Sequence, residues 1–402
     1  MEVLSCSPRY WRTAIFHLNS ESEPPFDPAS LLSWSKDLPV DIVILKPDAS
    51  RLPKNTDGIS EKQRVRALVD LLSTHIHRCR SIHIDVHLNS SLPLILRSFP
   101  AYPSILESLS LFCDLNDPQE NHEDELSLPI RPEWGEIHGT GLRSLVLDGR
   151  NLPDVCSGWL RSQCSLQQLV LLNYSAGIIP LDHILETLQN LPQLLRLKFE
   201  KVFFPSGWRV DHNTFFASHI QILHFEEVEA LTIDEFFQLC AVTQLHMIHI
   251  TRCRLPPYLP AISKLVLEDI DPRVRIEHIL REWEGCHLWI GRCRGFGDSF
   301  LDMLRTTSDW DDDEFHCPRV ETLYLAYLPR FSLKRLKKMI KVRNRFINYD
   351  DPSWRTTAPF GPAIRELHVI RCDIAELTQK DMEWFNSRVV TFRYLKRVEP
   401  EI

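Results

Sequence analysis

The sequence predicts an α/β fold, a leucine-rich-repeat solenoid with irregular repeats, a curved parallel sheet and helices on the convex side. The segment LHMIHITRCRL, residues 245–255, is the first observation. Its residues 245, 248, 250 and 255 are apolar and residue 253 is cysteine, which is the L-x-x-L-x-L-x-x-C-x-L core of a leucine-rich repeat. The core recurs along the chain, and segments with helical periodicity separate the copies. Strand, turn and helix in repetition predict a parallel sheet covered on one side by helices.

The first half of this repeat core, three apolar residues at places one, four and six, occurs along most of the chain. Copies begin at residues 79, 106, 142, 166, 194, 220, 245, 262, 320 and 364, and a weaker copy spans Leu288 and Ile290. The first and last starting points enclose ten intervals, so the mean period is about 28 residues, within the leucine-rich-repeat range. We expect one short strand at each copy. Cys253, Cys293 and Cys372 occupy the same place in three copies, where a small side chain suits a buried turn.

The segments between the strand cores have the spacing of amphipathic helices. We expect helices at 180–192, 231–242, 273–285, 332–346 and 378–388. In the second of these, Thr232 and Glu235 have the spacing of a capping box, and Leu231 and Phe236 that of a hydrophobic staple. Each repeat buries its apolar face only against its neighbours, so we expect residues 79–402 to form one cooperative solenoid.

The first 78 residues differ from the repeats, and we expect them to form an N-terminal capping region, residues 1–78. Residues 38–45, LPVDIVIL, predict a strand that starts the sheet. Residues 60–79 predict a helix. The acidic segments at 121–125 and 309–314 fall in long intervals between repeats, where we expect solvated loops.

Composition excludes several classes of function. The 402 residues are 44% hydrophobic and carry a net charge of −8, so there is no basic excess of the kind that marks a nucleic-acid partner. No continuous apolar run reaches the roughly 18 residues that a membrane span needs. The first residues do not have the apolar block of a secretory signal. Eleven cysteines in such a chain predict reduced thiols in the cytoplasm or nucleus.

The N-terminal part resembles a known family. The run SPRYWRTAIFHLNS is similar to the segment that follows the F-box in the large F-box domain-containing proteins of mushroom-forming fungi. LLSWSKDLPVDIVIL resembles a strand of that family through Trp34 and Asp41, and LVDLLSTHIHRCRSIHI resembles the next motif through Arg80 and Ser81. FPAYPSILESLSL then resembles its first P-x-L-E-S-L repeat. The resemblance covers most of the chain and implies a leucine-rich-repeat region that selects substrates for a ubiquitin ligase.

One departure from the family changes what this resemblance implies. The F-box itself, an L-P-x-E-I-L-x-x-I-F helix bundle, would precede Cys6, and residues 1–402 do not contain it. In the family that bundle docks on the Skp adaptor of a cullin ubiquitin ligase. We therefore expect binding to the Skp adaptor only if an F-box is present upstream. The two alternatives are that residues 1–402 are part of a longer gene product with an F-box, or that they belong to a paralogue that keeps only the repeats.

Three clusters invite a chemical interpretation, and each has a structural alternative. His83 and Asp85 share a strand face but have no third ligand at a fixed spacing, so we expect no metal. Glycines 291, 295 and 297 precede a predicted helix, but G-x-x-x-G-x-G is not a nucleotide-binding spacing, and we expect no cofactor. The basic run 334–345 is either a solvated helix face, a partner of the acidic segment 309–314, or a docking site. No catalytic set is visible, so we expect a non-enzymatic protein.

The concave face of the predicted sheet is the candidate binding surface. The residues that alternation places there near the C-terminal end are Met247, His249, His287, Trp289, Tyr324 and His368. Exposed aromatic side chains on a rigid sheet suit a protein partner, because they give large contact area at low entropic cost. The opposing possibility is that the segments 295–319 and 345–363 cover them. The sequence thus favours a protein-recognition module, and the alternative is a stand-alone scaffold with no ubiquitin-ligase role.

Overall fold

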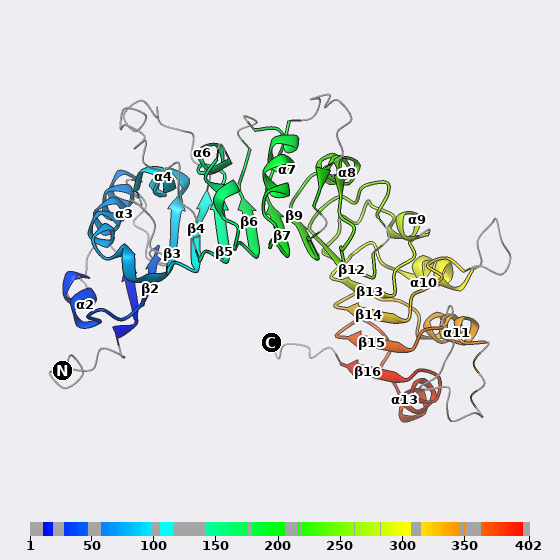
Figure 1. Ribbon diagram of the computed structural model, residues 1–402. Helices are drawn as coiled ribbons and strands as arrows, with labels where there is room; N and C mark the ends of the chain where they lie inside the picture. Colours follow the sequence, from blue (N-terminus) through cyan, green and yellow to red (C-terminus); the bar gives the residue numbers. More distant parts are fainter. Residues whose placement is uncertain are drawn as a thin grey trace. The chain divides into compact units, whose positions relative to one another are not determined.

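The computed structural model divides into two compact units, Met1–Ile220 (unit 1) and Gln221–Ile402 (unit 2). It describes residues 11–18, 28–46, 58–98, 105–115, 141–156, 158–175, 179–205, 215–217, 219–260, 262–281, 283–306, 315–345, 347, 349 and 363–396. Each unit is an α/β repeat array in which seven parallel strands follow one another in chain order within the described residues (Figure 1). The coarse prediction of a solenoid-like parallel α/β architecture is therefore confirmed.

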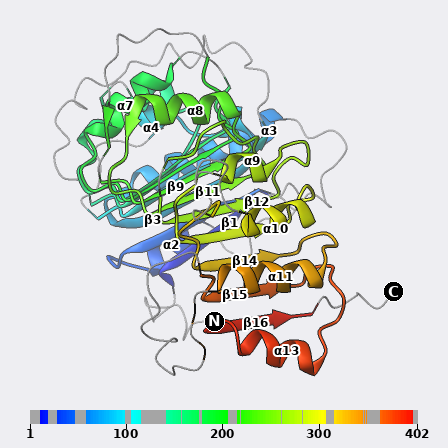
Figure 2. The same ribbon diagram turned by 90° about the vertical axis from the view of Figure 1, so that its right-hand side faces the viewer.

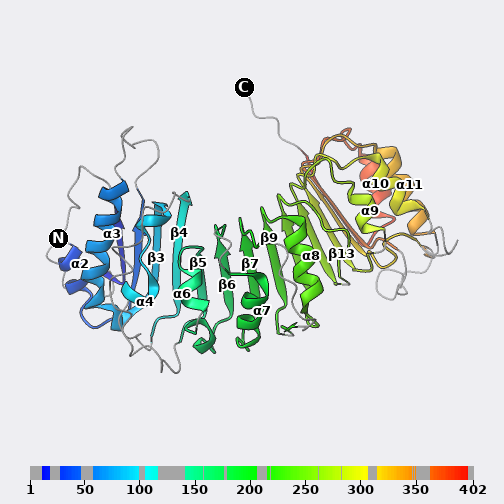
Figure 3. The same cartoon turned by 90° about the horizontal axis from the view of Figure 1, so that it is seen from above.

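Unit 1 places its helices on one face of its strands, as Figure 3 shows for α4, α6 and α7. Its parallel strands are β1 (Thr13–His17), β2 (Val40–Leu45), β3 (Cys79–Leu88), β4 (Ser108–Leu115), β5 (Ser144–Asp148), β6 (Gln168–Leu172) and β7 (Arg196–Glu200), and β8 (Phe215–Phe216) is a short additional strand. Its α-helices are α2 (Pro28–Trp34), α3 (Gly58–Ser73), α4 (Ile95–Ser98), α6 (Leu152–Cys156) and α7 (Leu181–Gln189), with 3-10 turns η3 (Ile76–Arg78), η4 (Asn89–Ser91) and η6 (Leu160–Ser162).

The first 78 residues contribute strands to the sheet of unit 1. β1 pairs in parallel with β2, and β2 pairs in parallel with β3. Asp41 on β2 accepts hydrogen bonds from Ser81, at 2.8 Å, and from Arg80 on β3. The strand predicted at 38–45 is confirmed, whereas β1 was not predicted. The boundary at residue 78 remains a prediction.

Unit 2 repeats the same arrangement, and Figure 2 shows α10, α11 and α13 along one face of β14, β15 and β16. Its parallel strands are β9 (Ile222–Glu226), β11 (Met247–Thr251), β12 (Lys264–Glu268), β13 (His287–Gly291), β14 (Thr322–Ala326), β15 (Glu366–Ile370) and β16 (Thr391–Leu395), and β10 (Cys240–Ala241) is a short additional strand. Its helices are α8 (Ala230–Leu239), α9 (Ile276–Leu280), α10 (Asp298–Arg305), α11 (Leu333–Arg343) and α13 (Gln379–Asn386).

The five-residue strands of unit 2 pair without a register shift. The second and fourth residues of each strand point toward the helices, because side chains alternate between the two faces of a strand. In β9 to β15 these residues are 0 or 1% exposed, as Ile248, Ile250, Leu323, Leu325 and Leu367 illustrate. The apolar positions of the sequence repeat thus form the core, as predicted. The first, third and fifth residues form three rows on the opposite face.

A residue with left-handed backbone follows almost every one of these strands. In unit 2 these residues are Glu227, Arg252, Asp269, Arg292, Tyr327 and Arg371, with φ between 50° and 54°. Each donates its backbone N–H to the last carbonyl oxygen of the next strand, for example Arg252 to Glu268 at 3.0 Å. The left-handed conformation costs a non-glycine residue about 1–2 kcal/mol, and this hydrogen bond offsets part of the cost. The chain then turns back toward the helices.

The cysteines predicted to be structural lie just beyond this turn. Cys253 Sγ donates to the Thr251 carbonyl at 3.1 Å and accepts from the Val228 N–H at 3.3 Å. Cys293 and Cys372 bond to carbonyls in the same way, and both are buried. Burial raises the pKa of the Cys253 and Cys293 thiols to about 11, so both are protonated at neutral pH. Their position in the turn and their burial confirm the structural interpretation.

The helices follow the prediction with several corrections. α7, α11 and α13 lie within the predicted ranges, but α9 has only five residues and α3 ends at Ser73. The predicted capping box of α8 is wrong: the helix begins at Ala230, its N-cap Glu229 makes no side-chain cap, and Thr232 lies inside it. The predicted staple is also wrong, because Leu231 is exposed. The acidic segments 121–125 and 309–314 lie outside the described residues.

Candidate functional site

The open face of unit 2 is the face of its sheet opposite to helices α8 to α13. Register pairing aligns the third residues of the seven strands into one row across this face. From β9 to β16 this central row reads His224, His249, Val266, Trp289, Tyr324, His368 and Arg393. Five of these seven side chains carry rings, and Val266 divides the rings into a pair and a group of three.

The group of three, Trp289, Tyr324 and His368, forms a continuous stack that we call the ring column. The centroids of Trp289 and Tyr324 are 5.0 Å apart with an interplanar angle of 16°. Those of Tyr324 and His368 are 3.9 Å apart at 12°. These distances are close to the roughly 4.8 Å between neighbouring strands, so the sheet itself sets the stack. Because the planes stack across the strands, the ring edges face outward from the sheet.

His368 is the buried end of the ring column. Its side chain is 4% exposed, and its Nε2 lies 3.8 Å from Glu366 Oε2, beyond hydrogen-bond distance. Burial and the Arg393 guanidinium lower the pKa of His368 below its usual value, against an opposing effect of Glu366. His368 is therefore neutral at pH 7 and contributes a flat apolar surface rather than a charge. Among the predicted face residues, it is the one with little surface for a partner.

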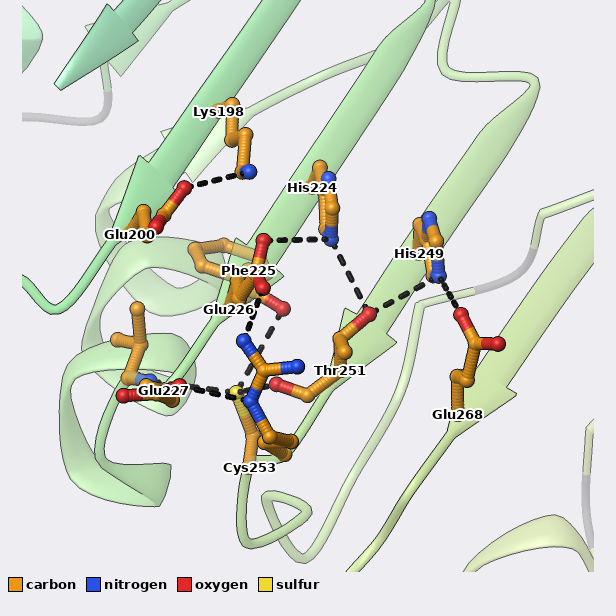
Figure 4. A network of polar contacts seen from close by, with 12 residues as sticks. Lys198, Glu200, His224, Phe225, Glu226, Glu227, His249, Thr251, Cys253 and Glu268 are labelled. Atoms are coloured by element: carbon orange, nitrogen blue, oxygen red, sulfur yellow. Dashed lines mark hydrogen bonds and ion pairs between the residues drawn. The ribbon is translucent and has the colours of Figure 1, made fainter. Parts of the chain in front are cut away.

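The histidine pair, His224 and His249, lies at the other end of the row (Figure 4). The two imidazoles stack with centroids 4.1 Å apart and planes at 5°. Thr251 Oγ1 lies 3.2 Å from His224 Nε2 and 3.0 Å from His249 Nε2. A hydroxyl has one proton, so it can donate to only one of these two ring nitrogens at a time. Thr251 thereby links the two imidazoles through one side chain.

Glutamates from the fifth row stand beside the histidine pair and are themselves held by arginines. Glu268 Oε2 lies 3.4 Å from His249 Nε2, and Glu268 Oε1 lies 2.5 Å from Arg292 Nη2. Glu226 lies 3.9 Å from His224 Nε2 and pairs with Arg252. Each arginine is a left-handed residue that follows a later strand and reaches back to the glutamate. The charges at this end of the face thus form ordered pairs.

The two remaining predicted residues lie in the first row. Met247 on β11 is half-buried and pairs in register with Lys264 of β12. His287 on β13 is exposed and pairs with Lys264 on one side and Thr322 on the other. The structure therefore brings all six predicted residues to the open face. Of the two segments considered as a cover, the first contributes α10, which lies on the helix side of the sheet (Figure 2). Residues 307–314 and most of 345–363 lie outside the described residues.

Sequence reasoning missed the polar partners of these rings. Thr251, Glu226, Glu268, Arg252 and Arg292 were not singled out. The sequence repeat could have pointed to them. The fifth-row residue and the left-handed residue after it stand at a fixed sequence offset from each repeat core. Arg393 was missed because its strand, β16, was not recognised. Its core, Val389-x-x-Phe392-x-Tyr394, has the repeat spacing with aromatic residues in place of leucines.

The other candidate clusters do not form a site. Asp85 pairs with Lys46 at 2.9 Å rather than with His83 as a metal-binding partner. Across the part of the chain that the structure describes, no group of three or more His, Cys, Asp or Glu side chains is placed to hold a metal. In the basic helix α11, Arg335 pairs with Asp298 at 3.1 Å and Lys337 with Asp381 of α13. The acidic segment 309–314, one of the partners considered for this basic run, lies outside the described residues, so that option stays untested.

A pocket in unit 1 lies apart from the predicted face. It has a volume of about 240 Å³ between α3 and the segment 90–98. Lys62 and Arg66 of α3 line it with Ser91, whose hydroxyl is buried without a hydrogen-bond partner among the described residues. Leu92 and Pro93 form its apolar wall. No sequence motif pointed to it.

The fold and the open face together define an α/β repeat protein with a ring-lined sheet face. No protein-family model matches the chain, and no curated protein matches it. No described helix is both long enough and apolar enough to cross a membrane.

Proposed function

We propose that the chain is a leucine-rich-repeat protein that acts as a non-enzymatic recognition module, and that it binds a protein partner through the open face of unit 2. The ring column is the single observation that carries this proposal. Trp289 and Tyr324 are held by strands whose neighbouring core residues are fully buried, so little entropy is lost when a partner covers them. Rigid aromatic side chains of this kind are typical anchors of protein interfaces.

The chemistry of the face favours binding over catalysis. The Thr251 hydroxyl, a possible nucleophile beside the histidine pair, is already shared between two imidazoles. The neighbouring glutamates are each paired with an arginine. Such a network fixes side-chain positions and supplies polar contacts around an aromatic centre, which is the usual anatomy of an interface.

The proposal is tested by finding a partner and then separating affinity from stability. Proximity labelling in cells, followed by purification of the identified protein, provides a direct binding assay. Trp289→Ala and Tyr324→Ala should each weaken that binding by about 2 kcal/mol, which is roughly thirtyfold in Kd. Lys338→Ala on the exposed side of α11 is the matched control and should bind as the unchanged protein does. Equal affinity of all variants would contradict the proposal.

The resemblance to fungal F-box proteins suggests a narrower role, in which the module selects substrates for a ubiquitin ligase. Asp41, Arg80 and Ser81 belong to the resembling motifs and contact one another across β2 and β3, which supports the view that these motifs are structural. Since residues 1–402 do not contain the F-box motif, a pull-down with purified Skp adaptor should give only background. Stoichiometric capture at micromolar concentration would place the docking surface within the repeats and contradict this expectation.

A further inference from the structure

β16 is the outermost strand of unit 2 among the described residues, and it pairs with β15 alone. In a parallel pair, the N–H and C=O of one residue point to the same side, and the next residue points to the other side. Thr391 donates to the Arg365 carbonyl, and the Leu395 carbonyl accepts from Arg371. Thr391, Arg393 and Leu395 therefore face β15. The backbone N–H and C=O groups of Phe392 and Tyr394 point away from β15, toward the free edge of the sheet.

The core is also incompletely covered at this strand. The second and fourth residues of β9 to β15 are 0 or 1% exposed, but Phe392 and Tyr394 are only half-buried. Phe385 of α13 stacks on Phe392 at 4.5 Å and covers its helix side. On the open face, Leu395 is 57% exposed. An unpaired strand edge beside exposed apolar side chains is the arrangement that accepts a further strand.

The other terminal strand of the chain provides a contrast. Within the described residues β1, in unit 1, pairs with β2 alone, yet its residues on the helix side, Ala14 and Phe16, are 5% and 4% exposed. Leu32 of α2 is fully buried nearby in the sequence and belongs to the same core. The inward residues at that end are covered by unit 1 itself. The half-buried inward residues of β16 are thus a property of that strand and not of end strands in general.

We propose that the outer edge of β16 binds an extended peptide segment of a partner protein as an added strand. Such a peptide would hydrogen-bond to the backbone of Phe392 and Tyr394. Its inward side chains would meet the rings of those two residues, so they should be apolar. The peptide side chain between these two would lie on the open face of the sheet, beside Arg393. Because Arg393 is exposed and positively charged, this side chain should be acidic. The recognised sequence is therefore apolar–acidic–apolar.

The charge of Arg393 argues against a second copy as the occupant. A two-fold antiparallel pairing that uses the outward groups of Phe392 and Tyr394 places its axis at Arg393. Arg393 of one copy would then lie directly opposite Arg393 of the other, and like charges in directly opposed positions are destabilising. An acidic partner strand has no such conflict. This surface shares no residue with the ring column, so the inference extends beyond the proposed function.

The test uses random twelve-residue peptides displayed on phage and selected on immobilised protein of residues 1–402. Selected peptides are then synthesised and measured by fluorescence anisotropy. The expected consensus alternates apolar, acidic and apolar residues. Two versions of each peptide are methylated at alternate backbone nitrogens, one at the odd-numbered and one at the even-numbered residues. Only one version should lose binding, because only every second N–H of an added strand points toward β16.

Two protein variants localise the binding. Tyr394→Pro removes an outward N–H without removing a hydrogen bond to β15, and proline is tolerated on edge strands. It should weaken peptide binding about tenfold relative to Tyr394→Val, which keeps the N–H. Arg393→Glu should weaken binding of acidic peptides about threefold to fivefold and favour peptides with lysine at the same place. Trp289→Ala should leave the affinity unchanged.

Four results would overturn the inference. Selected peptides without alternation, or equal binding to the Tyr394→Pro and Tyr394→Val proteins, would show that the edge does not accept a strand. Loss of peptide binding in Trp289→Ala would place the peptide on the ring column, which would support the proposed function instead. Dimers in sedimentation that dissociate in Tyr394→Pro would identify a second copy as the occupant.

Discussion

Trp289 and Tyr324 are 35 residues apart in the sequence, yet their rings stack with centroids 5.0 Å apart. The stack follows from strand register, which pairs Trp289 of β13 with Tyr324 of β14. The same register pairs Leu288 with Leu323 in the core. The proposed recognition surface and the core therefore use adjacent residues of one strand, on opposite faces. Substitutions on the two faces should have different effects.

Core substitutions in β14 and β15 should destabilise the protein much more than substitutions in the ring column. Leu323→Ala and Leu367→Ala remove fully buried side chains and should each lower the free energy of unfolding by about 2–5 kcal/mol. Trp289→Ala and Tyr324→Ala lose half-buried stacking contacts, worth about 0.5–1.5 kcal/mol. Urea denaturation of the four variants measures the difference. The opposite order of effects would mean that the assignment of faces is wrong.

Arg343 should be essential for the stability of unit 2. Its side chain is fully buried and donates to the carbonyls of His316 and Cys317 at 2.8 Å. Burial lowers its pKa to about 10, so it remains charged at neutral pH. Arg343→Ala would remove the guanidinium donors from these two carbonyls and create a cavity, at a cost of about 3–5 kcal/mol. Thermal denaturation beside Lys341→Ala, an exposed neighbour on α11, provides the comparison. Similar melting temperatures for the two variants would refute this role.

His368 should make stability depend on pH below neutrality. Its pKa in the folded protein is lowered, so the unfolded chain takes up the proton first as the pH falls below about 6.5. Stability should be unaffected above that pH and should decrease below it, by at most about 1.4 kcal/mol per pH unit. His368→Phe keeps a ring in the stack and removes the titration. The difference in unfolding free energy between the two proteins at pH 5.5 and pH 7.5 measures the effect. A difference that is the same at both values would contradict it.

The left-handed residues that follow the strands should tolerate glycine. Lys201 has φ of 52°, a conformation that costs a β-branched residue most. We expect Lys201→Gly to be neutral or stabilising by up to about 1 kcal/mol, and Lys201→Val to be destabilising by about 1–2 kcal/mol. Lys264→Gly, at the exposed start of β12, is the control and should destabilise. A glycine that destabilises both sites equally would show that the backbone conformation at Lys201 has no special cost.

The strands could be predicted from the sequence because their determinant is local. An apolar residue at the second and fourth place of a five-residue strand enters the core, and the pattern repeats in each unit. The strand β16 was not predicted because Phe392 and Tyr394 stand in place of the aliphatic residues. The capping box of α8 was wrong because Thr232 and Glu235 have the right spacing but the helix begins before them. The true capping box, in α13, joins Thr378 to Asp381.

The polar features of the site could not be predicted as readily, because their partners are distant in the sequence. Arg343 lies in a run of basic residues that looks solvated, and only the fold brings it beneath the carbonyls of residues 316 and 317. The burial of His368 depends on how neighbouring strands cover it. The contacts of the histidine pair could not be predicted without knowing that β9 and β11 pair in register, because this register brings Thr251 to both rings.

The length of chain between consecutive strands varies widely, while their register does not. Met247 and Lys264 pair in register although 17 residues separate them, and Thr322 and Glu366 do so across 44 residues. The register of these strands is thus independent of the length of chain that connects them. The position of each residue on the open face is set by its strand and by its row. Insertions between strands and substitutions on the face can therefore accumulate independently, so the proposed binding surface can change in sequence while the spacing of the repeats drifts.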